Sequence, residues 1–419
     1  MSKFIIQGGK PLRGEIRVSG MKNAATPILA ASILTQEDCI IDNVPKITDV
    51  ERMENILRGL GASVKRISKH RVEINCSKID TTNPDFQEVK EMRSSILLMG
   101  PLLARFKKIK IPHPGGCIIG ARPIGTHFEA LEALGAKIVQ DQNYLHLEAK
   151  KLIGTKIVLR EFSVTATENA MMAACFASGI SVIKIAAAEP HIQDLANFLN
   201  SMGAKIRGAG THTITIEGVE KLHGTKYTLA PDQIEAGTFV IAAIVTRGDV
   251  IIDKINPDHL DIILEKLREA RANFEVGKDY IHIKPSSLLK ATNIDTRPYP
   301  GFPTDLQAPW GVLATQAEGT TLIHETMFEG RLRYIDELKK MGVNAIIADP
   351  HRALITGPTP LYGTQITSFD LRAGATLIIA SLIAEGQSEI KDIEQVDRGY
   401  EEIEKRLRKL GANIKRVKD

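Results

Sequence analysis

The chain has 419 residues, which is long for one hydrophobic core and favours two domains of about 200 residues each. Its apolar fraction of 43% is that of a globular protein, and its net charge of +4 without dense basic runs suits anionic small ligands better than a nucleic-acid-binding tail. The N-terminus has no signal-peptide core, no apolar run reaches the roughly 18 residues of a membrane span, and no CxxC pair occurs, so we expect a cytoplasmic protein with free thiols.

One helix-to-strand pattern recurs six times along the chain, at nearly equal spacing. In five copies a glycine follows the last apolar turn of a helix, where it is typical of a C-terminal cap, and Arg271 takes its place in the fourth copy. The six copies are LRGLGASV from Leu57, LEALGAKI from Leu131, LNSMGAKI from Leu199, LREARANF from Leu267, LKKMGVNA from Leu338 and LRKLGANI from Leu407.

Leu-x-Gly turns at Leu12, Leu152, Leu222 and Leu361 each precede a segment that is apolar nearly all round, which predicts a buried helix. The last repeat stops before its next strand, and the segment 1–20 contains that missing piece, so we expect the N-terminal strand to complete the C-terminal repeat. The sequence therefore predicts two α/β domains of three repeats each, one at 21–230 and the other joining 1–20 to 231–419. A ring or solenoid with only a scaffolding role remains an alternative.

The starts of the predicted buried helices also align at a nearly constant spacing. Lys22 and Arg93 oppose the helix dipole, so we interpret them as parts of an anion site. We interpret Thr165, Glu235 and Thr304 as N-terminal caps. Asp305, in GFPTDLQ, fits either a cap or a general base near a ligand hydroxyl.

A second aligned position is basic in most copies. Several arginines at equivalent positions of a repeat point toward a common region, and arginine suits bidentate contact with carboxylate and phosphate. We therefore expect a multiply anionic ligand between the two halves. The aligned residues are Lys46, Arg122, His191, His259, Arg331 and Arg398.

The stretch HPGGCIIGARPIG contains the one cysteine outside a predicted core element, Cys117. The paired glycines before it indicate a loop, and nearby Arg122 would favour the thiolate. Cys39, Cys76 and Cys175 lie on predicted strands or buried helices, and we interpret them as structural. No metal-binding, P-loop, dinucleotide or GxSxG motif occurs, so we expect no metal site.

Six segments together resemble a known family. SGMKNAATPILAA, EMRSSILLMGPLLAR, PGGCIIGARP, FPTDLQ, FDLRAGATLIIA and VDRGYEEIEKRLRKLGA are similar to the UDP-N-acetylglucosamine enolpyruvyl transferases, over residues 4–415. The resemblance implies two inside-out α/β domains, each of three βαβαββ-like units, with the ligand cleft between them. It also implies transfer of the enolpyruvyl group of phosphoenolpyruvate to the 3-hydroxyl of UDP-N-acetylglucosamine, the committed step of peptidoglycan synthesis, without a cofactor.

The resemblance further implies residue roles. Cys117 would act as general acid and covalent residue, Asp305 as base, and Asp370 beside Cys117. Phosphoenolpyruvate would be held by Lys22, Arg122 and Arg398, with Arg331 and Arg372 nearby. The nucleotide-sugar side would be lined by Asn23, Arg93, Arg122, Pro123, Ile124, Gly125, Thr126, Ser163, Val164, Thr165, Asp305 and Met327.

Two positions depart from the family pattern: Thr165 stands where Gly is common, and Thr126-His127 where a Leu-His pair is common. Two alternatives to this function remain. The sister enzyme that uses shikimate 3-phosphate shares the fold but would give no role to a thiol, and a nucleic-acid clamp would use the loop cations. The 5% aromatic content argues against the clamp, so we expect neither a nucleic-acid nor a membrane partner. The sequence leaves the number of subunits open.

Overall fold

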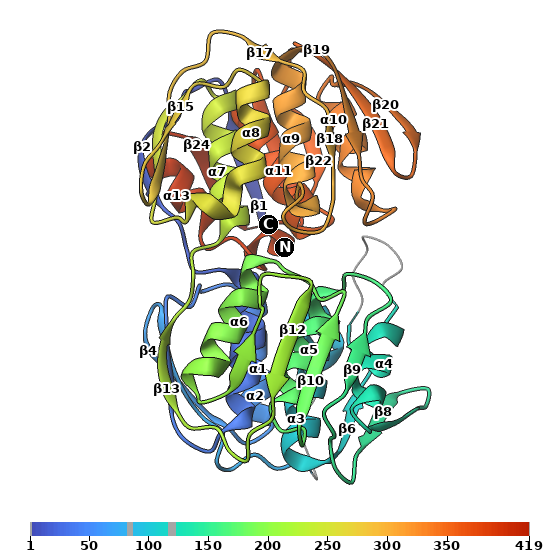
Figure 1. Cartoon of the computed structure of the whole chain (residues 1–419). Coiled ribbons are helices and arrows are strands. Elements are labelled where there is room, and N and C mark those ends of the chain that lie inside the picture. Colours follow the sequence, from blue (N-terminus) through green and yellow to red (C-terminus); the bar gives the residue numbers. More distant parts are fainter. Residues whose placement is uncertain (1, 82–86, 116–122, 419) are drawn as a thin grey trace. The chain divides into compact units, whose positions relative to one another are not determined.

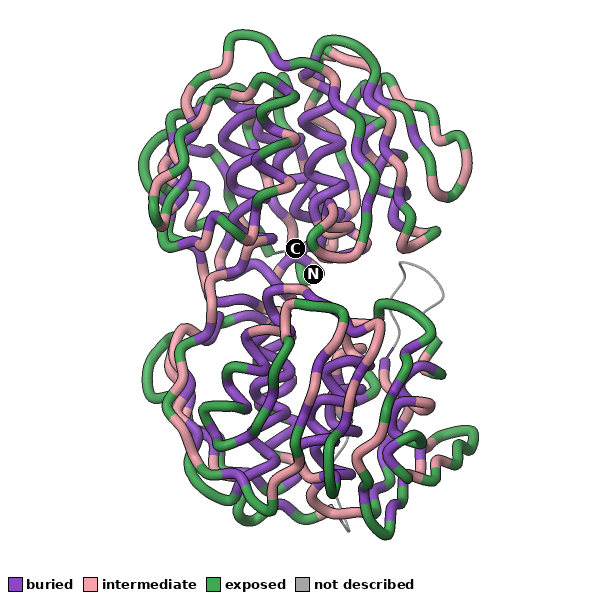
Figure 2. Tube along the Cα trace, viewed as in Figure 1, coloured by how far each residue is buried: buried purple, intermediate pink, exposed green. Residues whose placement is uncertain are grey.

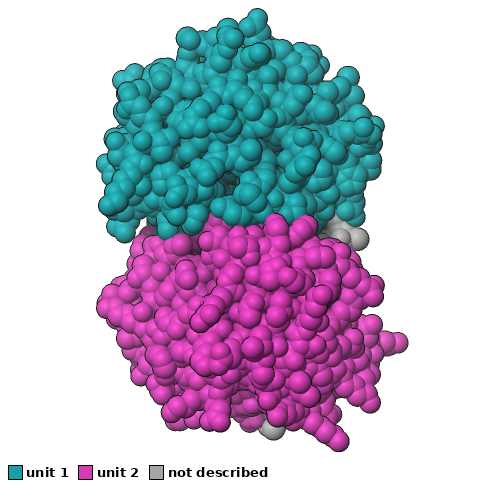
Figure 3. Space-filling model, in the orientation of Figure 1, with its two compact units in different colours: residues 1–19, 118–121, 231–419 teal, residues 20–117, 122–230 magenta. Residues whose placement is uncertain are grey.

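The computed structural model describes residues 2–81, 87–115 and 123–418, so Cys117 and Arg122 lie outside the described residues. The chain divides into two compact units (Figure 3). Unit 1 joins Met1–Ser19 to Pro231–Asp419, and unit 2 begins at Gly20 and ends at Ala230. Each unit has a hydrophobic core of its own.

Unit 2 contains three sheets among its described residues, one for each repeat. Their strands, in spatial order, are β13 (Thr225–Thr228), β3 (Cys39–Asp42), β5 (Arg71–Asn75) and β4 (Ser63–Ser68); β11 (Lys205–Arg207), β12 (Thr213–Glu217), β10 (Ile180–Lys184) and β9 (Lys156–Val158); and β6 (Lys108–Pro112), β8 (Tyr144–Glu148) and β7 (Lys137–Gln140).

Unit 1 repeats this plan in its described residues (Figure 1). Its three sheets are β22 (Gln365–Thr367), β23 (Gln387–Lys391), β1 (Ser2–Gln7) and β24 (Asn413–Lys418); β15 (Phe274–Val276), β16 (Tyr280–Ile283), β14 (Asp249–Asp253) and β2 (Arg13–Arg17); and β17 (Leu289–Lys290), β19 (Ala317–His324), β21 (Arg352–Gly357) and β20 (Asn344–Asp349), with β18 (Ile294–Asp295) also beside β19.

The N-terminal segment belongs to the sheets of unit 1. β1 pairs antiparallel with β23 on one side and β24 on the other, which supplies the strand that the last repeat lacks. β2 pairs in parallel with β14, although the chain then enters unit 2. In the reverse sense, β13 pairs in parallel with β3 of unit 2 before the chain returns to unit 1. In the described part of the chain, the passages between the units lie between Ser19 and Gly20 and between Ala230 and Pro231.

Six helices that are apolar nearly all round form the interior, as their sequences predict, and Figure 2 shows them buried. Three lie in each unit: α1 (Lys22–Ala31), α3 (Met99–Phe106) and α5 (Val164–Ala174) in unit 2, and α7 (Gln233–Val245), α9 (Thr304–Gln316) and α11 (Leu371–Ile383) in unit 1. Within unit 1, α9 packs against both α7 and α11. Helices inside and sheets outside define an inside-out α/β fold.

Amphipathic helices complete each repeat, and short helices join the elements. The amphipathic helices are α2 (Thr48–Gly59), α4 (Gly125–Ala133), α6 (Pro190–Ser201), α8 (Asp261–Glu269), α10 (Tyr334–Lys340) and α13 (Ile403–Lys409). The short ones are α12 (Glu394–Asp397) and the 3-10 turns η1 (Ser32–Leu34), η2 (Gln87–Glu91), η3 (Arg93–Leu98), η4 (Pro257–Leu260) and η5 (Arg331–Arg333). Because η3 precedes α3, the second inner helix in chain order starts as a 3-10 turn rather than as the α-helix expected from Arg93.

The predicted C-terminal caps are confirmed by the backbone angles that follow the amphipathic helices. The five repeat glycines have φ between +95° and +100°, as Gly61 and Gly135 illustrate. Arg271, the exception in the sequence, adopts the same left-handed conformation with φ of 59°. An L-residue with a side chain pays about 1–2 kcal/mol for that conformation, so the repeat geometry overrides the local preference of Arg271.

Candidate active site

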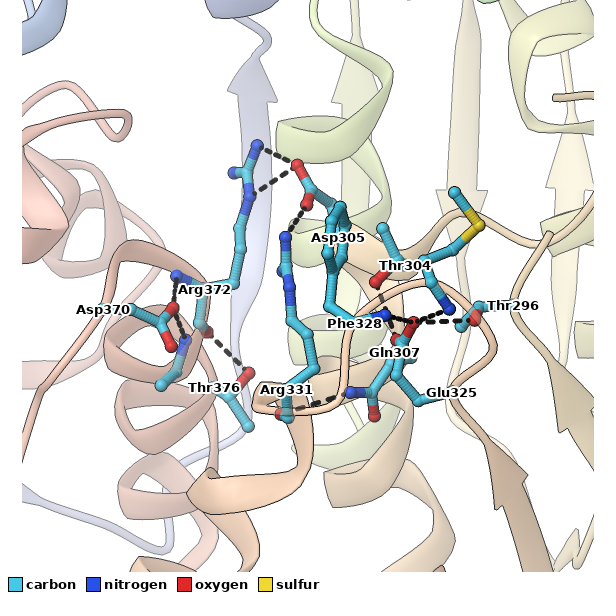
Figure 4. A network of polar contacts seen from close by, with 12 residues as sticks. Thr296, Thr304, Asp305, Gln307, Glu325, Phe328, Arg331, Asp370, Arg372 and Thr376 are labelled. Atoms are coloured by element: carbon cyan, nitrogen blue, oxygen red, sulfur yellow. Dashed lines mark hydrogen bonds and ion pairs between the residues drawn. The ribbon is translucent and has the colours of Figure 1, made fainter. Parts of the chain in front are cut away.

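The first turn of α9 carries a carboxylate held by two arginines (Figure 4). Arg372, at the start of α11, donates from Nε and Nη2 to Oδ2 of Asp305, at 3.0 and 2.8 Å. Arg331, at the start of η5, donates from Nη2 to Oδ1 of the same carboxylate at 2.7 Å. The structure thus brings together three residues that the sequence places 26 to 67 positions apart.

The Asp305 carboxylate is partly buried, with 20% of its side chain exposed. Burial alone would raise the pKa of Asp305, but the charges of Arg372 and Arg331 outweigh it and hold that pKa well below the usual range of a carboxyl group. Asp305 is therefore ionised at neutral pH, and it is a weak base for as long as both arginines bind it.

Arg331 has side-chain donors that the Asp305 carboxylate does not occupy. Arg331 is 9% exposed, and its Nε and Nη1 find no hydrogen-bond partner among the described residues. Buried donors without partners cost about 1–3 kcal/mol each, so such atoms mark a place where a ligand is expected. Guanidinium donors of this kind favour an anionic ligand, although the charge of Asp232 also acts on Arg372.

Arg372 is fixed from its other side by an aromatic hydroxyl. Its Nη1 donates to the hydroxyl of Tyr400 at 3.1 Å, and that hydroxyl lies 2.9 Å from Oγ1 of Thr238 on α7. Burial lowers and the Asp305 charge raises the pKa of Arg372, with a net increase, so this guanidinium keeps its charge. Arg372 is thus a fixed cation.

Two other predicted site residues of unit 1 have simpler surroundings. Asp370 is the N-terminal cap of α11, because its Oδ1 accepts from the backbone N–H groups of Arg372 and Ala373 at 2.7 and 2.9 Å. Arg398 follows α12 and donates to Oε1 of Gln395 at 3.3 Å. Both lie in unit 1 with Asp305.

In unit 2, Lys22 is the first residue of α1, a helix whose first turn has no acidic residue and whose N-terminus has no side-chain cap. Its Nζ lies 3.2 Å from Oδ2 of Asp49, which is 2% exposed in the first turn of α2. A lysine at a helix N-terminus opposes the dipole, and the buried carboxylate compensates for this. Neighbouring Asn23 is half-buried.

The positions that depart from the family pattern, Thr165 and Thr126-His127, lie at the starts of α5 and α4. Ser163 caps the helix by accepting from the N–H of Ala166 at 3.4 Å. Oγ1 of Thr165 lies 2.8 Å from Nε2 of His127, on α4. Thr126, beside His127, donates to Oε1 of Glu161 at 3.1 Å. Both departures therefore make polar contacts, and these contacts link α4 to the segment in which α5 starts.

The remaining predicted residues of unit 2 lie around these helix starts. Arg93 begins η3 and is half-buried, as is Val164 at the start of α5. Pro123 and Gly125 are exposed and flank the half-buried Ile124 immediately before and at the start of α4.

The interpretation of Thr165, Glu235 and Thr304 as N-terminal caps is wrong, and so is the cap alternative for Asp305. The caps lie slightly earlier in the chain: Ser163 for α5 and Asp232 for α7, whose Oδ1 accepts from Ile234 and Glu235 N–H. α9 starts after Pro303 without a side-chain cap. The side chains of the misassigned residues thus remain available for tertiary contacts.

The three described cysteines have the environment of structural thiols. Burial raises the pKa of Cys39 to about 11 and those of Cys76 and Cys175 to about 12, so none is a thiolate at neutral pH. Within residues 2–81, 87–115 and 123–418, no group of three or more His, Cys, Asp or Glu residues has the arrangement of a metal site. In the same ranges, no helix has the length and apolar character that crossing a membrane requires.

Sequence reasoning missed three residues that contact the residues selected from the sequence. Asp49 contacts Lys22, Tyr400 contacts Arg372, and Glu325 contacts Thr304. Asp49 was detectable, because it is an acidic residue at the start of an amphipathic helix. In KITDVERM it closely follows Lys46, one of the aligned loop positions. Tyr400 and Glu325 gave no comparable signal, because each acts through contacts made by distant segments.

Comparison with known proteins places this chain and its fold in one family. The model of the EPSP synthase (3-phosphoshikimate 1-carboxyvinyltransferase) family matches residues 6–407, and the chain belongs to that family. The crystal structure of the enolpyruvyl transferase NikO from Streptomyces tendae is 25% identical and superimposes with a TM-score of 0.90 over 99% of both chains. EPSP synthase from Acinetobacter baumannii shares the fold, with a TM-score of 0.76 at 20% identity over 100% of both chains.

Relatives of higher identity carry a more particular name. UDP-N-acetylglucosamine 1-carboxyvinyltransferase from Acidobacterium capsulatum is 45% identical over 100% of this chain and 96% of its own length. UDP-N-acetylglucosamine 1-carboxyvinyltransferase 2 from Clostridium acetobutylicum is 48% identical over 100% of both chains. These matches confirm the resemblance drawn from the motifs.

Proposed function

We propose that this protein is an enzyme that transfers the enolpyruvyl group of phosphoenolpyruvate to the 3-hydroxyl of UDP-N-acetylglucosamine and releases phosphate. This is the first committed step of peptidoglycan synthesis, and we place it in the cytoplasm. The observation that carries the proposal is the pair of arginines around Asp305, where Nε and Nη1 of the buried Arg331 have no hydrogen-bond partner among the described residues. The names of the full-length relatives at 45% and 48% identity support the same reaction.

The proposed substrate sites follow from the sequence assignments. Lys22, Arg122 and Arg398 hold phosphoenolpyruvate, and Arg331 and Arg372 supply further positive charge. The nucleotide sugar contacts the half-buried starts of η3 and α5, the segment before α4 and Met327. We also propose that the two units act as domains, at 21–230 and at 1–20 with 231–419, and that the ligands bind in a cleft between them.

The chemistry is an addition followed by an elimination. Asp305 takes the proton of the sugar 3-hydroxyl while the oxygen of that hydroxyl bonds to C2 of phosphoenolpyruvate. Cys117 gives a proton to C3, which becomes a methyl group. The Cys117 thiolate then takes a proton back from this methyl group while the C2–O bond to phosphate breaks. Asp305 returns its proton to the departing phosphate, which the arginines stabilise. Asp370 works beside Cys117 in the proton transfers.

The ion pairs of Asp305 impose a condition on this mechanism. With both arginines bound, the pKa of Asp305 is too low for an efficient base. An anionic substrate competes for Arg331 and Arg372, which draws positive charge away from the carboxylate and raises its pKa toward the usual range. Binding of phosphoenolpyruvate thus prepares Asp305 to accept a proton.

The decisive experiment measures phosphate release from phosphoenolpyruvate with either UDP-N-acetylglucosamine or shikimate 3-phosphate as acceptor. We expect release with the nucleotide sugar alone. Release with shikimate 3-phosphate would assign the chain to the sister reaction. A Cys117→Ser variant with undiminished activity would also favour that reaction, because it gives no role to a thiol.

Cys117 is tested separately by an epoxide-phosphonate such as fosfomycin. We expect time-dependent loss of activity, since a reactive thiolate opens the epoxide and forms a covalent thioether. The Cys117→Asp variant should resist this inactivation. Equal inactivation of both forms would remove Cys117 from the proposed mechanism.

A further inference from the structure

Glu325, which immediately follows β19, has a fully buried carboxylate outside the residues assigned to catalysis. Its Oε1 accepts from Thr296 Oγ1 at 3.0 Å and from the N–H groups of Met327 and Phe328 at 2.8 and 3.2 Å. Its Oε2 accepts from Thr304 Oγ1 at 2.7 Å. Figure 4 shows these contacts meeting at one side chain.

The strand register explains why Glu325 reaches these partners. β18 and β19 pair in parallel with Asp295 opposite His324, so the next residues, Thr296 and Glu325, leave the sheet together. The backbone of Glu325 is fixed as well, because its N–H donates to the carbonyl of His351 at 2.7 Å and its carbonyl lies 2.6 Å from His351 Nδ1. The carboxylate therefore has a defined place at the end of the sheet.

The four donors come from three segments that meet beside the proposed active site. Thr304 starts α9 and is the residue before Asp305. Met327 and Phe328 lie in the loop that leads to Arg331, the second partner of Asp305. One carboxylate thus connects the helix that carries the proposed base to the loop that carries its arginine.

A second contact ties the same loop to the same helix. Nε2 of Gln307, on α9, donates to the carbonyl of Arg331 at 3.4 Å, and Oε1 of Gln307 accepts from the hydroxyl of Tyr334 at 3.0 Å. Burial and the charge of Glu325 raise the pKa of Tyr334, so this hydroxyl stays protonated and keeps donating. The backbone of Arg331 is thereby set relative to α9.

We propose that Glu325 is a positioning residue of the enolpyruvyl transfer, which holds Asp305 and Arg331 in the geometry that the reaction requires. This inference rests on the proposed function for its kinetic readout. In the described chain, the groups that donate to the Glu325 carboxylate are two hydroxyls and two backbone amides, and none is a cation. The carboxylate therefore serves as a hydrogen-bond acceptor. An acceptor of the same shape should therefore replace it.

The test compares Glu325→Ala, Glu325→Gln and Thr304→Val with wild type. Glu325→Ala removes all four contacts, and we expect kcat to fall about 100-fold, the cost of misplacing reacting groups by about 1 Å. Thr304→Val removes the contact to α9 alone, and we expect kcat to fall about tenfold. Glu325→Gln keeps the Oε1 acceptor, and we expect it to restore most of kcat and the wild-type pH profile.

Gln316→Ala is the matched control, because Gln316 is the last residue of α9 and donates to the carbonyl of Thr359 at 3.2 Å. It removes a side-chain anchor from the opposite end of the same helix. We expect it to lower Tm with kcat unchanged. A folded Glu325→Ala enzyme that behaves like this control would overturn the inference, and if Glu325→Ala does not fold, an unchanged kcat in Thr304→Val would do so.

Amide hydrogen exchange of the 325–331 loop tests the same inference without the reaction. We expect the Met327 and Phe328 amides to lose protection in Glu325→Ala and to keep it in Glu325→Gln. Unchanged protection in Glu325→Ala would overturn the positioning role whatever the substrate. Changed protection in a protein that releases no phosphate with UDP-N-acetylglucosamine would instead count against the proposed function alone.

Discussion

Two helix starts in unit 1 occupy equivalent positions of the repeat, and each carries an acidic side chain paired with arginine. Glu235, on α7, binds Arg406 through both carboxylate oxygens and accepts from the N–H of Ser19 at 2.7 Å. Asp305, on α9 in the next repeat, binds Arg331 and Arg372. Repeat position and pairing chemistry are therefore shared.

The two sites differ in their exposure and in how many of their hydrogen-bonding groups have partners. The side chain of Glu235 is 3% exposed, and Arg406 also donates to the carbonyl of Arg17 and to Ser19 Oγ. Asp305 is 20% exposed and has two arginines, and within the residues that the structure describes Nε and Nη1 of Arg331 have no hydrogen-bond partner. The closed pair of Glu235 joins β2 and α13 to α7, whereas the more open cluster of Asp305 retains guanidinium donors for a ligand.

Exchange of the two carboxylates for amides should separate them most clearly. Asp305→Asn removes the proposed base, and we expect kcat for phosphate release to fall about 10³-fold, within the usual contribution of a general base. Glu235→Gln should leave kcat near wild type once the protein is folded. Similar kcat values for the two variants would end the distinction between them.

The reverse contrast should appear in stability. Glu235→Ala leaves the Arg406 guanidinium, 14% exposed, without its carboxylate, and we expect the free energy of unfolding to fall by about 3 kcal/mol. Asp305→Ala leaves two arginines without their shared anion, but the Asp305 carboxylate is 20% exposed, against 3% for Glu235. Because solvent screens the more exposed ion pairs, we expect a smaller loss. Urea unfolding followed by circular dichroism measures both, and an equal loss would contradict the contrast.

The Asp305 pairs should also give unfolding a dependence on acid. Because the folded-state pKa of Asp305 lies below the unfolded value of about 3.8, its stabilising effect is complete above pH 4 and is lost as the pH falls toward the lower, folded-state pKa. The difference in Tm between wild type and Asp305→Asn should therefore be largest near neutral pH and shrink below about pH 4. A difference that stays constant down to pH 2.5 would show that the carboxylate is not ion-paired in solution.

Much of the scaffold follows from local sequence. The left-handed residue after each amphipathic helix was predictable, and even Arg271 obeys the repeat rather than its own preference. The apolar inner helices were equally clear, since a helix without a polar face has to be buried. Among the site residues, Asp305 and Arg331 were selected from their positions in the repeat.

The contacts of the site residues were less predictable. Thr165 and Thr304 look like caps, but a slightly earlier helix start gives them tertiary partners instead, His127 and Glu325. The second arginine that binds Asp305 is Arg372, which comes from the following inner helix, α11. Such pairings are set by packing between repeats, and no local pattern contains them.

A third helix start of the same alignment, that of α5, should give the smallest effect. Thr165 holds the position that Glu235 holds in the next repeat, and its hydroxyl is 2.8 Å from Nε2 of the buried His127. Thr165→Val keeps the shape and removes this hydrogen bond, so we expect the KM for UDP-N-acetylglucosamine to rise about fivefold, the effect of about 1 kcal/mol, with kcat and the KM for phosphoenolpyruvate unchanged. A changed kcat with an unchanged KM would place Thr165 with the Asp305 chemistry rather than on the nucleotide-sugar side, and an unaltered enzyme would make its contact with His127 structural, like that of Glu235 with Arg406.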